Sequence, residues 1–281
     1  MTYDSITVMQ TSPHVGAEIG NVDLTKPLSD TEVKEIRAAI NAHGVIFFRD
    51  QEISHEDHDR FVRYFGDPHV HAGGKSTASV AVDGYPAIRK QYFDKNSPRI
   101  SGETWHSDQS CAEIPPDYSI LYQEIIPPHG GGNTMFLSAT KAYETLSDSM
   151  KAYLEGKTAT HTADKAYAAK LTKDNKETHL VVDHPMVITH PENGRKVLFV
   201  SPLFTSHING VPEDESRHML ELLYEHTNRP NWMMRFNWTN HAIAMWDNRA
   251  VQHYAIWDYW PNERLGYRMF VKGTARPISS S

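Results

Sequence analysis

Cysteine is almost absent from this sequence of 281 residues, in which Cys111 is the only one. No disulfide can therefore form within the chain. The first five residues, Met1 to Ser5, also lack the basic and apolar segments of a secretory signal peptide. Together these absences predict a reducing, cytoplasmic location. We interpret Cys111 as a filler side chain, because no second cysteine accompanies it at a metal-binding spacing.

Long apolar runs and a surplus of positive charge are also missing. No stretch approaches the roughly 18 to 20 apolar residues that a membrane-spanning helix needs. The 28 Lys and Arg residues are outnumbered by 35 Asp and Glu residues, which gives a formal net charge of -7. Because nucleic acids and membrane surfaces attract proteins rich in basic side chains, we expect neither kind of partner. No repeat or change of composition divides the chain, so we predict one domain that spans residues 1–281.

Capping residues predict where several helices begin and end. Ser29 and Glu32 form a capping box ahead of an apolar stripe, and Gly44 can take the left-handed conformation that ends a helix. Ser54 starts a second predicted helix, which ends before Gly66. Amphipathic patterns predict further helices at residues 139–146, 148–156 and 213–225. The charged segment 161–178 is interpreted as either a flexible lid or a solvated helix.

Short strand-like runs make up much of the remaining sequence. They lie at residues 45–48, 79–82, 118–126, 134–137, 185–190, 196–200, 232–238, 242–246 and 266–271. Asn193 and Gly194 predict a hairpin turn with positive backbone φ angles, and the weak pattern of residues 67–103 predicts a long loop. Many short strands with few helices predict a mixed α and β fold, with a core of two β-sheets and helices packed outside.

Three residues have the types that bind a redox-active metal. His106 and Asp108 are two residues apart, so on an extended strand both side chains would point to the same side. His253 follows the apolar run 242–246 and would complete a set of two histidines and one carboxylate. Such a set leaves three metal positions open, which suits iron(II) with a bidentate cosubstrate and dioxygen. A structural zinc site would instead close all four positions with protein ligands.

Two arginines follow the distal histidine at short spacing. Arg264 and Arg268 stand 11 and 15 residues beyond His253. Fixed positive charges close to a metal ligand predict a site for an anion beside a metal.

The combination of these motifs resembles the taurine dioxygenase family, also called the TauD/TfdA family, of iron(II)- and 2-oxoglutarate-dependent dioxygenases. The resemblance extends over nearly the whole chain and rests on the segments 16–24, 45–50, 105–108, 131–134, 190–191, 194–196 and 246–268. It implies a double-stranded β-helix (jelly-roll) core with flanking helices, and iron bound by His106, Asp108 and His253. It also suggests a homodimer or homotetramer.

The resemblance further implies roles for residues that bind the two organic molecules. Thr134 and Arg264 match the family's residues for the distal carboxylate of 2-oxoglutarate, and a planar guanidinium suits that task because it can donate two parallel hydrogen bonds. Arg268 and His71 match residues that bind the acidic group of the substrate. Two aromatic residues match positions of the substrate pocket; they are Tyr167 and Phe204.

Three departures from the taurine-type pattern concern the substrate. Asn133 replaces the usual aspartate of the Gly-Gly-Asp-Thr turn, Gly102 replaces a polar residue, and Tyr167 replaces a phenylalanine. None of them affects the expected sites for iron and 2-oxoglutarate. They make taurine itself a less certain substrate than a related anion.

The expected reaction is hydroxylation of a small organic anion with dioxygen, accompanied by release of succinate and CO2. The anion is expected to be a taurine-like sulfonate or a related sulfate ester, phosphonate or carboxylate. An aryloxyalkanoate dioxygenase of the 2,4-D type is the alternative within this family. Two alternatives from other classes remain open, namely a zinc- or manganese-dependent hydrolase on a jelly-roll scaffold and a non-catalytic binding protein.

Overall fold

The computed structural model of the protein describes residues 3–70, 79–98, 100, 102–164 and 180–279. The largest sheet lies in the order β1 (Thr7–Gln10), β2 (Ala17–Gly20), β3 (Val45–Phe48), β14 (Ala242–Asp247), β6 (Tyr118–Ile125), β16 (Arg264–Val271), β5 (Tyr85–Phe93) and β4 (Ser79–Val82). A smaller sheet consists of β13 (Met233–Phe236), β7 (Thr134–Ser138) and β15 (Val251–Ala255).

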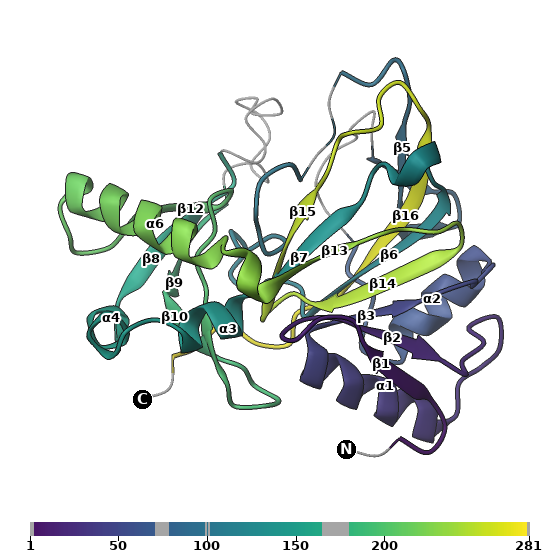
Figure 1. Ribbon diagram of the computed structural model, residues 1–281, viewed down its shortest axis with the longest axis horizontal. Coiled ribbons are helices and arrows are strands. Elements are labelled where there is room, and N and C mark those ends of the chain that lie inside the picture. Colours follow the sequence, from purple (N-terminus) through teal and green to yellow (C-terminus); the bar gives the residue numbers. More distant parts are fainter. Residues whose placement is uncertain (1–2, 71–78, 99, 101, 165–179, 280–281) are drawn as a thin grey trace.

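The remaining elements are short strands and helices. One flanking sheet lies in the order β12 (Thr205–Ile208), β8 (Thr158–Thr162) and β9 (Val181–Pro185). A second flanking sheet pairs β10 (Val187–Thr189) with β11 (Lys196–Leu198). The helices are α1 (Asp30–His43), α2 (His55–Arg63), α3 (Ala139–Glu144), α4 (Asp148–Leu154) and α6 (Glu213–Thr227), with 3-10 turns at Pro128–Gly130 and Pro230–Trp232. Helices α1 and α2 lie beside the largest sheet, and α3, α4 and α6 gather with the flanking sheets on the other side of the molecule (Figure 1).

Strand β3 shows why the two main sheets form one core. Its side chains alternate between faces, as the period of a β-strand requires. Val45 and Phe47 point into the cluster between the two sheets, while Ile46 and Phe48 join the cluster beneath α1 and α2. Phe47 stacks on a ring of the smaller sheet, Phe236, at a centroid distance of 3.8 Å. The mixed α and β architecture with a jelly-roll core is therefore confirmed.

The predicted capping residues are present at both N-terminal helices. The Ser29 hydroxyl accepts from the Glu32 backbone N–H, and the Glu32 carboxylate accepts from the Ser29 N–H in return. Gly44 ends α1 with a φ of 74°. A second capping box joins Ser54 to Asp57 at the start of α2. These local interactions explain why α1 and α2 were recognisable from the sequence.

Other sequence predictions need correction. The strands β1, β2, β5, β8, β9, β12 and β15 were not predicted. Residues 67–103, expected to form a loop around the predicted strand 79–82, contain all of β5 as well as β4. Residues 185–190 do not form one strand, because β9 ends at Pro185 and β10 begins at Val187. In the hairpin between β10 and β11, only Gly194 has a positive φ, of 71°, whereas Asn193 does not. Most of the segment interpreted as a lid, 165–178, lies outside the described residues.

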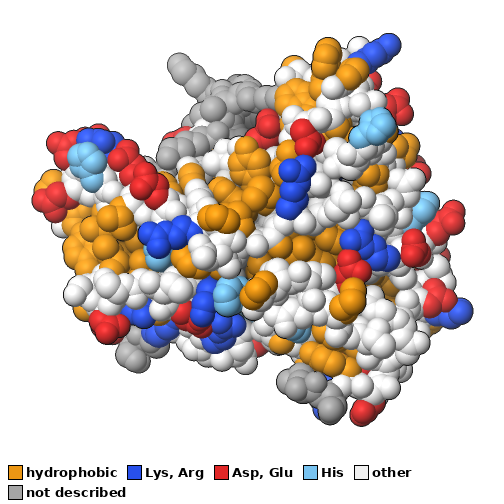
Figure 2. Space-filling model, in the orientation of Figure 1, with side chains coloured by type: hydrophobic (Ala, Val, Ile, Leu, Met, Phe, Trp, Pro, Cys, Tyr) orange, Lys and Arg blue, Asp and Glu red, His pale blue; other side chains and the backbone are white. Residues whose placement is uncertain are grey.

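The molecular surface agrees with the near balance of charges in the sequence. Basic and acidic side chains are interspersed over the visible face, with hydrophobic side chains between them (Figure 2). No helix in the described part of the chain is long and apolar enough to cross a membrane.

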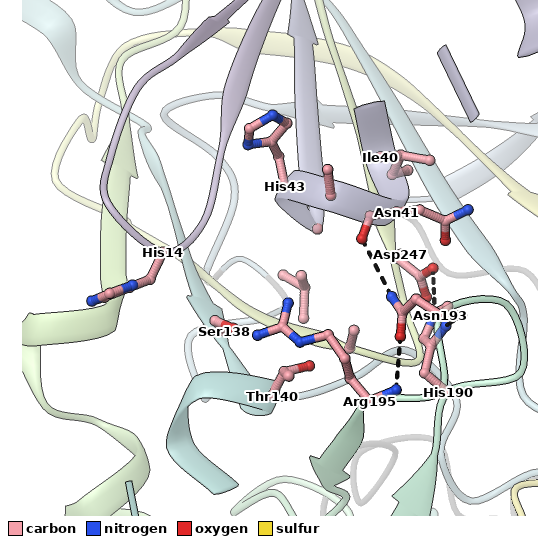
Figure 3. A pocket seen from close by; sticks show the side chains of 14 residues that line it. His14, Ile40, Asn41, His43, Ser138, Thr140, His190, Asn193, Arg195 and Asp247 are labelled. Carbon is pink, nitrogen blue, oxygen red and sulfur yellow. Dashed lines mark hydrogen bonds and ion pairs between the residues drawn. The ribbon is translucent and has the colours of Figure 1, made fainter. Parts of the chain in front are cut away.

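A buried ion-pair network joins the hairpin β10–β11 to the end of β14. Asp247 accepts from His190 Nε2 at 2.9 Å and from Arg249 Nη2 at 2.7 Å. Arg249 also donates to Glu192 of the hairpin loop at 2.8 Å. Burial opposes ionisation of Asp247, but Arg249 and His190 hold the pKa of its carboxyl below the ordinary value. His190 and Asp247 face each other at a small pocket between α1 and the hairpin (Figure 3).

We expect the substitution Asp247→Ala to lower the free energy of unfolding by about 3 kcal/mol, because it leaves the guanidinium of Arg249 buried without its main partner. Chemical denaturation measures this loss. The control is Glu221→Ala on α6, which removes an exposed partner of Arg217 at 3.7 Å and should change the free energy by about 0.5 kcal/mol or less. Equal effects of the two substitutions would contradict a structural role for the network.

Candidate functional site

The three predicted metal ligands converge between the two main sheets. His253 lies in the middle of β15, and its backbone pairs with that of His106 through two hydrogen bonds of 2.9 and 3.2 Å. Asp108 follows in a turn, so the expectation that His106 and Asp108 share one extended strand was wrong. The bridge and the turn nevertheless bring one ligand atom from each residue within 4.8 Å of the other two.

The charges and tautomers of these groups suit a divalent metal. The Nδ1 atom of His106 lies 2.7 Å from the carbonyl oxygen of Thr104, which fixes the proton on Nδ1 and leaves Nε2 with a lone pair toward Asp108. Burial lowers the pKa of both histidines, so both rings are neutral. Burial alone would raise the pKa of Asp108, but the charge of Arg268 and the hydrogen bond from Ser119 hold it below its ordinary value. Two neutral imidazoles and one carboxylate are a donor set that fits iron(II).

Asn248 holds the backbone of Asp108 in place. Its side-chain oxygen accepts from the Asp108 N–H at 2.6 Å, and its side-chain nitrogen donates to the Asp108 carbonyl at 2.9 Å and to the Pro116 carbonyl at 3.0 Å. Ser119 donates to Oδ2 of the Asp108 carboxylate at 2.7 Å. Neither residue was predicted as part of the site. The only sequence signal was the position of Asn248 within the motif from Trp246 to Arg249.

Arg264 is a buried cation at the start of β16. It is 6% exposed, and burial lowers its pKa. The Gln123 amide, with its oxygen turned toward the guanidinium, accepts from Arg264 at 3.0 and 3.2 Å, whereas Nε makes no hydrogen bond. No carboxylate among the described residues forms an ion pair with Arg264. A buried guanidinium that is bound only to a neutral amide favours an anionic ligand.

The glycine turn before β7 gives Arg264 its space. A β-carbon on Gly132 would lie 3.0 Å from Cδ and Nε of Arg264, and Gly132 has a φ of 72° that other residues rarely adopt. Thr134 is the first residue of β7 after this turn and is buried. Its hydroxyl accepts from Nε1 of Trp238 at 3.0 Å, which leaves the hydroxyl proton for another acceptor.

Arg268 reaches the ligand atoms themselves. Its Nη2 atom contacts Oδ2 of Asp108 and lies 3.1 Å from Nε2 of His253. The guanidinium also lies over the rings of Trp246 and Phe270, at 5.3 and 4.8 Å from their centroids. These contacts place the second cation of β16 beside the predicted metal ligands.

The remaining predicted residues divide into described and undescribed ones. Phe204 is buried with its ring centroid 6.1 Å from that of His106, which brings it to the edge of the site. Cys111 packs with Phe204, and burial raises the pKa of its thiol to about 12, as expected for a filler side chain. His71 and Tyr167 lie outside the described residues.

Comparison with known proteins gives one consistent family. The model of the taurine catabolism dioxygenase TauD, TfdA family matches residues 7–270. The chain is 31% identical to an alpha-ketoglutarate-dependent sulfate ester dioxygenase of Pseudomonas putida, over 92% of this chain and 87% of the relative. It is 30% identical to an alpha-ketoglutarate-dependent 2,4-dichlorophenoxyacetate dioxygenase of Cupriavidus pinatubonensis, over 89% and 91%. A crystal structure of a taurine dioxygenase from Burkholderia xenovorans superposes with a TM-score of 0.84 and 38% identity, covering 98% of this chain and 93% of that one.

The contacts of Asn248 lead to a testable role in metal binding. We expect Asn248→Ala to weaken binding of Mn(II), a redox-inactive probe, about 10-fold or more, because the Asp108 backbone loses two hydrogen bonds. Calorimetric titration of the metal-free protein measures this affinity. The matched control is Asn240→Ala, which removes an exposed side chain that accepts from Ile126 and should leave the affinity unchanged. Equal affinities of the two variants would contradict this role.

Proposed function

The chain belongs to the taurine catabolism dioxygenase (TauD/TfdA) family and is an iron(II)- and 2-oxoglutarate-dependent dioxygenase, and on that premise we propose that it hydroxylates a small organic anion. One observation supports an anionic substrate. Strand β16 places two arginines on one face, of which Arg264 is buried without a carboxylate and Arg268 contacts the ligand atoms. The site therefore offers one cation to the cosubstrate and a second to the substrate.

We assign the metal to His106, Asp108 and His253. Their Nε2 and carboxylate atoms converge in a buried space, and the hydrogen bond from His106 to Thr104 presents the correct nitrogen. Iron(II) bound there would activate dioxygen together with 2-oxoglutarate. The protein contributes the fixed orientation of the ligands and the exclusion of water by the surrounding aromatic side chains. This chemistry differs from that of the hydrolase considered from the sequence, which would only activate water.

We assign the distal carboxylate of 2-oxoglutarate to Arg264 and Thr134. Arg264 offers N–H donors from a buried position, and the hydroxyl of Thr134 has a proton to donate. Charge-assisted hydrogen bonds of this kind are strong in a buried site. Gly132 keeps the space beside Arg264 clear.

The substitution Arg264→Gln should raise the KM for 2-oxoglutarate about 100-fold, since it removes the positive charge and the paired donors. Initial rates of succinate formation at increasing 2-oxoglutarate give this KM. Arg217→Gln, on the exposed face of α6, serves as the control and should leave the KM unchanged. A normal KM in the Arg264 variant would remove this residue from the cosubstrate site.

Arg268 is assigned to the acidic group of the substrate, with Phe204 on the side of His106. A sulfonate, sulfate ester, phosphonate or carboxylate would each satisfy a guanidinium. We favour a small sulfonate or sulfate ester, and an aryloxyalkanoate is the second candidate. His71 and Tyr167 stay proposed pocket residues on the basis of the family pattern alone.

A substrate panel tests the proposed function. Purified protein with iron(II), ascorbate and 2-oxoglutarate is mixed with an alkanesulfonate, an alkyl sulfate, an alkylphosphonate, an alkanoate or an aryloxyacetate, and succinate is measured. At least one anion should raise succinate formation well above the uncoupled background, whereas the matching uncharged alcohol should not. A panel in which no anion raises it would remove this substrate class.

We also propose that the chain works as a single domain of a cytoplasmic homodimer or homotetramer. The shared core beneath and between the main sheets supports a single domain. Light scattering of the purified protein tests the assembly, and the mass of one chain would contradict it.

A further inference from the structure

The residue beside Arg268 on the neighbouring strand is another arginine. Strands β16 and β5 are neighbours in the largest sheet (Figure 1). They pair in antiparallel register, with Arg268 directly opposite Arg89. Directly opposite residues of an antiparallel pair carry their side chains on the same face of the sheet. Because the side chain of Arg268 reaches Asp108, that face is the one at the candidate metal site. Arg89 therefore extends from the same face, one strand farther out.

We propose that Arg89 is a second binding residue for the acidic group of the substrate, and that it makes the site selective for tetrahedral oxyanions over carboxylates. This inference rests on the proposed function. It assigns to Arg89 a role that neither the metal ligands nor the two arginines of β16 provide.

The residues opposite Arg268 on its two neighbouring strands would surround an anion that binds there. Like charges directly opposite each other across two strands repel and destabilise the sheet. Burial lowers the pKa of Arg89, so its environment is less hydrated than bulk water, yet a guanidinium stays charged there. On the other side of Arg268, strand β6 places the apolar Leu121 opposite it. The substrate anion therefore has cationic partners on the β5 side of Arg268 and an apolar wall on the β6 side.

The number of acceptor oxygens explains the selectivity. One guanidinium donates two parallel hydrogen bonds that engage both oxygens of a carboxylate, so a second guanidinium would have to share an oxygen with the first. A sulfonate, sulfate ester or phosphonate has three terminal oxygens, so a second guanidinium finds an oxygen that the first does not occupy. Arg89 should therefore stabilise bound tetrahedral anions much more than bound carboxylates.

Equilibrium binding tests the inference without requiring turnover. The protein is loaded with Mn(II) and 2-oxoglutarate and titrated calorimetrically with hexane-1-sulfonate or with heptanoate, whose alkyl chains are matched. Arg89→Gln should weaken sulfonate binding about 10-fold or more, as loss of a charge-assisted hydrogen bond predicts, and heptanoate binding by less than about 3-fold. Binding of 2-oxoglutarate should be unchanged, and the unfolding temperature should not fall.

Lys90→Gln is the matched control. Lys90 is exposed, is adjacent to Arg89 on β5 and points to the opposite face. The Lys90→Gln variant should bind both anions with the same affinities as the unaltered protein. Three outcomes would each overturn the inference. The Arg89 and Lys90 variants could bind sulfonate with equal affinity, the Arg89 variant could lose equal affinity for both anions, or the unaltered protein could show no preference for sulfonate. If no anion of the substrate panel raised succinate formation, the proposed function would be refuted instead. The two failures are therefore distinguishable.

Discussion

The ionised carboxylate of Asp108, buried between two sheets, is the constraint on which the site depends. An isolated buried carboxylate would be strongly destabilising. Here the cost is offset by Arg268 and by the hydroxyl of Ser119. The side-chain amide of Asn248 holds the peptide on both sides of the carboxylate. Positive charge near this position therefore stabilises the ionised carboxylate, which is the form that would bind a metal.

The sequence revealed the parts of the molecule that depend on local rules or on fixed spacing. Helices α1 and α2 were recognisable because their capping residues act within one turn. The short spacing of Arg264 and Arg268 after His253 predicted an anion site, although the strand predicted at residues 266–271 began two residues later than β16 does. The family motifs supplied the proposed ligands, and the jelly-roll fold that they implied was confirmed by the structure and its relatives.

Features created by pairing between distant segments could not be predicted from the sequence. His106 is positioned by its bridge to His253, 147 residues away, and not by a strand shared with Asp108. The opposition of Arg89 and Arg268 arises from the register of β5 with β16, and β5 lies in a region whose weak pattern predicted a loop. Asn248 belonged to a recognisable motif, but its partner Asp108 became evident only when the chain was folded.

Because Arg264 and Arg268 share strand β16, the proposed sites for cosubstrate and substrate are parts of one rigid element. Between them the register of β16 with β6 shifts because the pairing skips Glu124 of β6, whereas β16 keeps a continuous register with β5 from Arg264 to Arg268. A slip of one residue in the strand would turn both arginines away from the metal side together. An insertion or deletion in β16 would therefore abolish binding of 2-oxoglutarate and of the substrate at once. Substitutions on β5 can instead change the substrate without altering the proposed binding site for 2-oxoglutarate.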